Sequence, residues 1–208
     1  MRRELSVVQS TEEAVEHRGP LLDKYLPSYD VRDYHEARVR AEPADAYVAF
    51  RSLDLERSRI VRLLFAIRNL PAFFLGRGAR PDSHSTSFVE TALALGWKVL
   101  EEEPGHEIVV GAVTQPWAPA VRFQGLAGHE FVEFHEPGFT KIAWNIRVIP
   151  EHFGRTRLAT ETRVTATDPV SRKRFLRYWR VVNPGIRLIR RISLRMVRRE
   201  LERSRRAA

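Results

Sequence analysis

The chain has 208 residues, of which 43% are apolar, and it contains no cysteine. This length and composition allow one sizeable core and argue against a disordered chain. The lack of cysteine excludes disulfides, thiolate metal sites and a cysteine nucleophile. The net charge of +9 is uneven, because residues 171–208 hold 14 basic and two acidic residues while the remainder is close to neutral. Such a basic end favours an anionic partner.

Residues 1–33 are predicted to form an N-terminal leader. They lack the apolar run that a secretory signal peptide requires, and no segment of the chain approaches the roughly 20 apolar residues of a spanning helix. We therefore expect a cytoplasmic protein. Within the leader, residues 21–26 are expected to dock as one helical turn.

Residues 34–41 alternate between apolar and charged side chains, which predicts a half-buried strand with His35 on its apolar face. Two helices are expected to follow, over residues 43–53 and 54–70. Pro43 suits the first turn of the first helix, and apolar residues three and four apart mark the second.

Residues 72–87 are predicted to be a loop, followed by a short helix over residues 88–95. The loop begins with Phe73 and Phe74, an apolar pair beside glycines. Such a loop could act as a lid or enter a membrane, and packing of both rings into the core is the alternative.

A run of antiparallel strands is expected to fill the middle of the chain. Glu103-Pro104-Gly105 is a good turn sequence, so a hairpin should form around it. Alternation and a high content of threonine and valine mark the last two strands. The expected strands cover residues 97–102, 106–114, 130–135, 139–149 and 155–167.

The C-terminal part of the chain is predicted to be helical. Asp168 can cap a helix and Pro169 suits its first position. Asn183-Pro184-Gly185 predicts an interruption, with a second helix over residues 186–203. The expected fold is therefore α+β, a curved antiparallel sheet of about six strands around a long C-terminal helix, with two short helices after the first strand.

Three stretches carry a resemblance to a known family: residues 42–47 (EPADAY), residues 154–164 (GRTRLATETRV), and Asp168-Pro169 ahead of Phe175 and Trp179. With the order of elements, they resemble the START-like (SRPBCC) superfamily, also called the helix-grip fold or the polyketide cyclase and lipid transport group. The resemblance covers residues 34–184 and leaves residues 1–33 and the basic helix 185–208 outside. It implies binding or carriage of a lipid, quinone or polyketide-like molecule.

A strongly curved sheet that closes on one helix leaves space, which in many folds becomes an apolar cavity with a few fixed polar groups. Large aromatic side chains and two threonine hydroxyls are suited to such a lining. The alternative is that the aromatic residues are ordinary core and that the hydroxyls are satisfied within their strand. The residues expected to line the cavity are Leu64, Trp97, Trp117, Trp144, Thr160, Thr162, Phe175 and Trp179.

No established catalytic motif is present in the sequence: neither His-Glu-x-x-His, nor Gly-x-Ser-x-Gly, nor a phosphate-binding glycine loop. Hydrolase, kinase and nucleotide-dependent oxidoreductase functions are therefore disfavoured, and no cofactor is expected. His35 is the candidate general base for a reaction of the cyclase or dehydratase kind, and a pocket threonine could also assist proton transfer. A hydrogen-bonded core histidine is the alternative, so a binder or carrier is the main hypothesis and an enzyme the second. A partner-binding module with a filled core is the third.

A small metal site would need His129, Glu133 and His135 on one face of the predicted strand at 130–135. Histidines near a turn are usually solvated, so no metal site is expected.

The basic C-terminal helix has a rough apolar stripe between arginines. The stripe could lie on an anionic membrane, or it could pack on the domain and leave the arginines in water. Packing is the default, membrane contact the second expectation, and nucleic acid is disfavoured because no recognition motif is present. The candidate membrane or anion contacts are Phe73, Phe74, Arg187, Arg190, Arg191, Arg195, Arg198 and Arg199.

Overall fold

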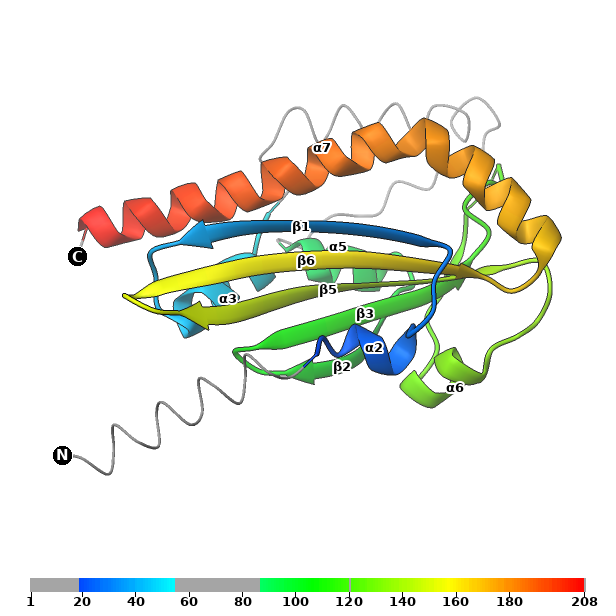
Figure 1. The fold of residues 1–208 in the computed structure, drawn as a ribbon, viewed down its shortest axis with the longest axis horizontal. Helices are drawn as coiled ribbons and strands as arrows, with labels where there is room; N and C mark the ends of the chain where they lie inside the picture. The colour runs from blue at the N-terminus through cyan, green and yellow to red at the C-terminus, as the bar shows by residue number, and fades with distance from the viewer. Residues whose placement is uncertain (1–18, 55–86, 120, 208) are drawn as a thin grey trace.

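The computed structural model of the protein describes residues 19–54, 87–119 and 121–207. The fold is α+β: a six-stranded antiparallel sheet with a long C-terminal helix along one face (Figure 1). The elements are α2 (Leu22–Tyr25), β1 (Val31–Val39), α3 (Pro43–Arg51), α5 (Phe88–Ala94), β2 (Lys98–Glu103), β3 (Glu107–Thr114), β4 (Phe123–Gln124), α6 (Gly128–Glu133), β5 (Thr140–Glu151), β6 (Arg155–Ala166) and α7 (Pro169–Ala207).

The sheet follows the order β1-β6-β5-β3-β2, and β4 pairs with β3. The predicted first strand begins three residues earlier than expected, at Val31, because β1 pairs with β6 from Val31 opposite Val164 to Val39 opposite Thr156. The predicted hairpin of β2 and β3, the short helix α5 and the two long strands β5 and β6 are confirmed, with ends that differ by at most two residues.

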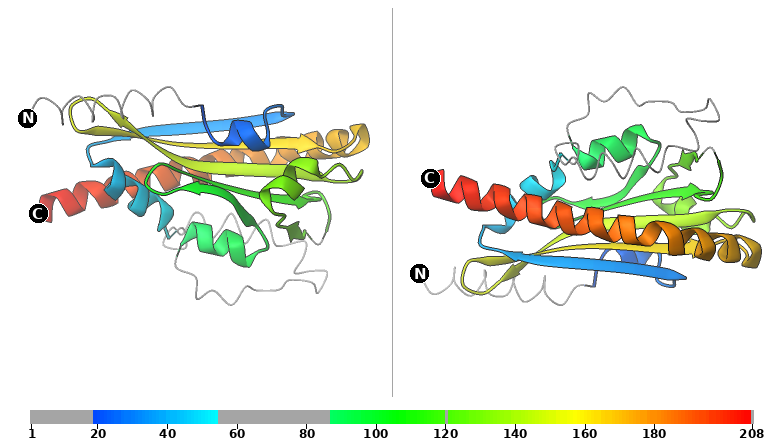
Figure 2. Two further views of the ribbon diagram at one scale, coloured as in Figure 1. Left: turned by 90° about the horizontal axis from the view of Figure 1, so that it is seen from below. Right: turned by 90° about the horizontal axis from the view of Figure 1, so that it is seen from above.

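Both faces of the central strands are covered. On the face below α7, the inner face, apolar side chains of the sheet pack with α3, α5 and the C-terminal half of α7. On the opposite, outer face, Leu22 and Leu26 pack with Phe131 of α6 against β3 and β5. Figure 2 shows α7 on one side of the sheet and α2 and α6 on the other. The expected docking of residues 21–26 is therefore confirmed.

The prediction of a strand over residues 130–135 is wrong, because residues 128–133 form the helix α6. The Glu130 carboxylate accepts a hydrogen bond of 2.7 Å from the amide of Ala127, which satisfies a free donor at the start of the helix. Only Phe131 in this segment is buried, since one turn of helix can place a single side chain against the sheet.

The prediction that the helix is interrupted at residues 183–185 is also wrong, because α7 is one helix of 39 residues with Pro184 inside it. The φ angle of proline is compatible with a helix, but its missing N–H removes one hydrogen bond of the helix. This loss is tolerated where the helix bends and the proline faces solvent. Pro184 is exposed, and α7 changes direction along its length (Figure 1). Phe175 before the proline and Leu194 after it are both buried, and Leu194 belongs to the core cluster of the inner face.

The apolar stripe of the basic helix packs into the core, which was the first of the alternatives expected from the sequence. Leu194, Val197 and Leu201 are buried there, and Ile189 and Ile192 pack against the same cluster. The stripe is therefore occupied by the protein's own core and not free to lie in a membrane. Among the described residues, no helix combines the length and the hydropathy needed to cross a bilayer.

Candidate functional site

A polar cluster interrupts the apolar inner face of the sheet beneath α7. Arg190 of α7 reaches the two threonines of β6, and its guanidinium donates one hydrogen bond to the hydroxyl of Thr160 and another to that of Thr162. Both threonines are buried. The Thr160 hydroxyl in turn donates to the carbonyl of Asn145 at 2.7 Å. The guanidinium is thus fixed by two oxygens that the sheet holds in place.

The neighbouring strand β1 adds a carboxylate and an imidazole to this cluster. Antiparallel pairing places Asp33 opposite Thr162 and His35 opposite Thr160. Asp33 is buried, with an exposed fraction of 4%, and its carboxylate lies 3.1 Å from Nε2 of His35. Its second oxygen accepts a hydrogen bond of 3.3 Å from Nε of Arg187, one helical turn before Arg190. We call Asp33, His35, Thr160, Thr162, Arg187 and Arg190 the inner polar cluster.

The cluster has a surplus of positive charge. Burial lowers the pKa of Arg190 to about 10, and the charge of Asp33 opposes that shift, so Arg190 remains protonated at neutral pH. Arg187 and Arg190 therefore face one buried carboxylate, that of Asp33. A guanidinium whose described partners are two neutral hydroxyls can still bind an anionic or strongly accepting group.

A group of aromatic rings adjoins the inner polar cluster. Trp144 of β5 is buried and lies opposite Thr162 in register, so one row across the sheet runs from Trp144 through Thr162 to Asp33. The Trp144 ring lies 5.0 Å from that of Phe88 and 6.2 Å from that of Trp97, between ring centroids. The inner face thus changes from aromatic to charged within three strands, which suits an amphipathic ligand.

The structure brings together half of the predicted lining: Trp97, Trp144, Thr160 and Thr162. Phe175 is buried in the first half of α7, where its ring lies 5.7 Å from that of Trp179. Trp117 is partly buried in the segment after β3. The remaining candidates, Leu64, Phe73 and Phe74, lie outside the described residues.

The arginines predicted as surface contacts divide into two groups. Arg187 and Arg190 make contacts with the inner polar cluster, although Arg187 is itself largely exposed, whereas the other four lie exposed on α7 without such contacts. Arg198 of the second group pairs with Glu202 one turn later, at 2.8 Å. The exposed residues of this group are Arg191, Arg195, Arg198 and Arg199.

The shared strand face of His129, Glu133 and His135 does not exist, because α6 is a helix that ends at Glu133. All three side chains are exposed. Within the ranges that the structure describes, no group of three or more histidine, aspartate or glutamate side chains could hold a metal ion.

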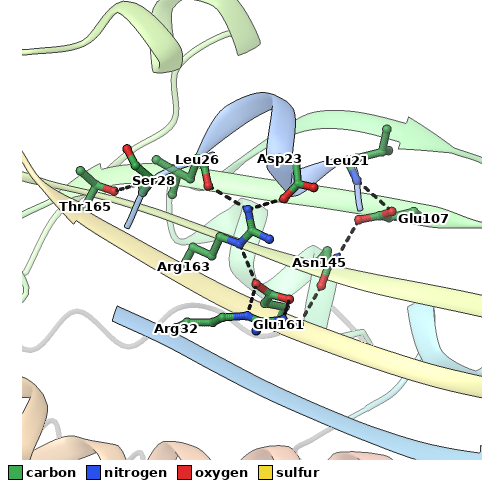
Figure 3. Close-up of polar contacts among 10 residues, drawn as sticks. All are labelled: Leu21, Asp23, Leu26, Ser28, Arg32, Glu107, Asn145, Glu161, Arg163 and Thr165. Atoms are coloured by element: carbon green, nitrogen blue, oxygen red, sulfur yellow. Dashed lines mark hydrogen bonds and ion pairs between the residues drawn. The ribbon is translucent and has the colours of Figure 1, made fainter. Parts of the chain in front are cut away.

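The outer face carries a second buried network, which ties the N-terminal segment to the sheet (Figure 3). Glu161 accepts hydrogen bonds from Arg32 at 2.8 Å and from Arg163 at 2.6 Å, and Arg163 also donates to the carbonyl of Leu26. Burial acts against ionisation of Glu161, but the hydrogen bonds from the two arginines outweigh it and lower the pKa. This network is enclosed by α2 and serves the fold.

The same network extends to a second carboxylate, that of Glu107 on β3. It accepts hydrogen bonds from Asn145 at 2.7 Å and from the amide of Leu21 at 3.1 Å (Figure 3). Burial raises the pKa of Glu107, because these partners do not fully replace water around the charge. The contact anchors the start of α2 on the sheet.

Sequence reasoning missed one member of the inner polar cluster, Asp33, and did not predict that Arg187 and Arg190 turn toward the sheet. Asp33 lies on the same face as His35, so extending the alternating pattern of the first strand by two residues would have included it. The direction of Arg190 has no comparable signal, because an arginine beside an apolar stripe is usually solvated.

Comparison with known proteins leaves the family open. No family model matches the chain, and no curated protein matches it. Among solved structures, a hypothetical protein from Helicobacter pylori matches with 12% sequence identity and a TM-score of 0.37, over 88% of this chain and 95% of that one. A likeness of this size carries no functional argument.

Proposed function

We propose that the protein binds or carries a small hydrophobic molecule with one polar end, in a site between the inner sheet face and α7. The class is a lipid, quinone or polyketide-like compound, as for the START-like superfamily that the sequence resembles. The observation that carries the proposal is Arg190, a charged side chain held between helix and sheet by Thr160 and Thr162 beside Trp144.

The energetic argument is that charges in a helix–sheet interface are costly. Burial of an ionised group destabilises the fold unless it is paired and hydrogen-bonded, and apolar residues of similar size often stabilise as well or better. Asp33 and Arg190 interrupt an otherwise apolar packing of Ile108, Val110 and Trp144 on this face. A polar ligand group bound by Arg190 would account for this arrangement, with the aromatic rings covering the apolar part.

The test is native mass spectrometry of the purified protein, followed by denaturing extraction of any bound molecule. We expect an apolar adduct on the wild-type chain and its loss in Arg190→Met, which keeps the length of the side chain but removes the charge. Arg191→Met is the matched control, since Arg191 is the exposed neighbour. A clean apo mass for the wild type, or equal retention by Arg190→Met, would contradict the proposal.

A second candidate function is an enzyme of the cyclase or dehydratase kind in the same site. The observation that favours it is the pair formed by His35 and Asp33, whose carboxylate lies 3.1 Å from Nε2. A buried carboxylate can orient an imidazole as a general base. A His35→Ala variant should retain the ligand but lose turnover of the extracted compound. If the wild-type protein leaves that compound chemically unchanged, the binder alone stands.

A further inference from the structure

Arginines from three elements meet at one end of the molecule. The end of β1, the start of β6 and the end of α7 lie there together (Figure 1). They line an open groove of about 590 Å³, whose lining contains six arginines and one carboxylate, that of Glu202. The arginines, together called the arginine groove, are Arg38, Arg40, Arg155, Arg198, Arg205 and Arg206.

The positive charge of the arginine groove is poorly compensated. Arg38 pairs with Glu151 at 3.0 Å and Arg198 with Glu202 at 2.8 Å. The other four arginines of the groove form no ion pair with any residue that the structure describes. Pairing of Val39 with Thr156 brings Arg40 and Arg155 to the same sheet end, one position further along. Like charges gathered in this way repel each other unless an anion lies between them.

An exposed aromatic side chain stands beside the groove. Phe153, at the tip of the β5–β6 hairpin and two residues before Arg155, is 98% exposed. Its φ angle is +64° and that of Gly154 is +65°, so two consecutive residues of this turn lie in the left-handed region. A phenylalanine is disfavoured in this conformation, where asparagine or glycine would serve the turn better. The ring lies 6.4 Å from that of the neighbouring His152, between ring centroids, and no core residue covers it.

We propose that this end of the molecule docks on a membrane surface containing anionic phospholipids. The groove arginines bind lipid phosphates, and Phe153 enters the interfacial layer beside them. Arginines next to a protruding aromatic ring match such a surface, because its phosphates lie directly above apolar material. Nucleic acid fits less well, because phosphate contacts would leave Phe153 without a role unless bases were unstacked. The docking surface is distinct from the proposed ligand site.

The experiment is co-sedimentation of the full chain with vesicles of phosphatidylcholine alone and of phosphatidylcholine mixed with phosphatidylserine. We expect binding only to the mixed vesicles at low salt, weakened by added salt because of screening. Arg205→Gln/Arg206→Gln should lower the partition coefficient about tenfold or more. The matched control is Arg177→Gln/Arg180→Gln, which removes the same charge from exposed positions in the first half of α7.

The aromatic contact is tested by Phe153→Asn, which removes the ring and places a residue suited to the turn at this position. This variant should bind the mixed vesicles about tenfold more weakly. Val181→Ala, at a side chain 80% exposed on α7, is its control and should bind as the wild type does. Absence of binding to the mixed vesicles, or an equal loss in the Arg177/Arg180 control, would overturn the docking surface. Retention on duplex DNA with no effect of Phe153→Asn would replace the membrane by nucleic acid. None of these results depends on the ligand of the inner site.

Discussion

The guanidinium of Arg190 on α7 donates a hydrogen bond to the hydroxyl of Thr162, 28 residues earlier on β6. This contact crosses from the closing helix to the inner face of the sheet. Since Thr162 also lies between Asp33 and Trp144 in the sheet, the bond joins α7 to both the charged and the aromatic part of the face. Removal of this hydroxyl therefore tests how much the contact between α7 and the inner polar cluster contributes to the stability of the fold.

Thr162→Val should lower the free energy of unfolding by about 1–3 kcal/mol, because it leaves a buried donor of Arg190 without its acceptor. Urea denaturation measures the change. Thr165→Val is the control on the same strand: its hydroxyl donates to the carbonyl of Ser28 in a more exposed position, so a loss below about 1 kcal/mol is expected. Equal losses in the two variants would mean that the Arg190 contact contributes nothing specific.

Glu161→Gln should destabilise the fold by about 3 kcal/mol, because it removes the charge that faces both Arg32 and Arg163 in a buried setting. Glu151→Gln serves as the control, since Glu151 pairs with Arg38 and Arg157 at a more exposed position and such pairs contribute about 1 kcal/mol or less. Chemical denaturation of both variants at neutral pH gives the comparison.

The contribution of Glu161 should depend on pH. Its pKa in the folded protein lies below the usual value, so the stabilisation is present above the unfolded pKa of about 4.3 and is lost as pH falls through the folded pKa. The stability difference between wild type and Glu161→Gln should therefore shrink only in acid. A difference that stays constant from neutral to acidic pH would show that the charge is not its source.

Phe153→Asn should stabilise the fold by about 1 kcal/mol, because asparagine tolerates the positive φ angle of this position better than phenylalanine does. Phe153→Ala, which removes the ring but keeps an unfavourable residue in the turn, should give little of this gain. Thermal or urea unfolding distinguishes the two. If both substitutions stabilise equally, loss of the exposed ring and not relief of the backbone is the cause.

Pro184→Ala should raise the free energy of unfolding by roughly 1–3 kcal/mol, since it restores a backbone donor inside α7 and introduces the residue with the highest helix propensity. Pro169→Ala, at the first position of the same helix, should give no comparable gain, because proline suits that position. If Pro184→Ala instead destabilises, the bend itself is needed to seat both halves of α7 on the sheet.

The order of helices and strands could be predicted because it depends on local periodicity. Alternation along residues 139–149 and 155–167 indicated β5 and β6, and the turn at Glu103-Pro104-Gly105 indicated their neighbouring hairpin. The candidate site was only partly predictable for the same reason. Trp144 and Thr162 are recognisable as inward-facing residues, whereas the pairing that makes them neighbours of Asp33 requires the sheet.

The sequence by itself determined the α+β class, the strand alternation and the helix start at Asp168-Pro169, because each follows from side chains within a few positions of one another. Tertiary structure decided which polar groups are buried. Glu161 lies on the charged face of its strand and is buried only because Arg32, 129 residues away, and the segment before β1 enclose it. Long-range packing also keeps α7 continuous through Pro184, since buried residues on both sides outweigh the local preference of that proline to end a helix.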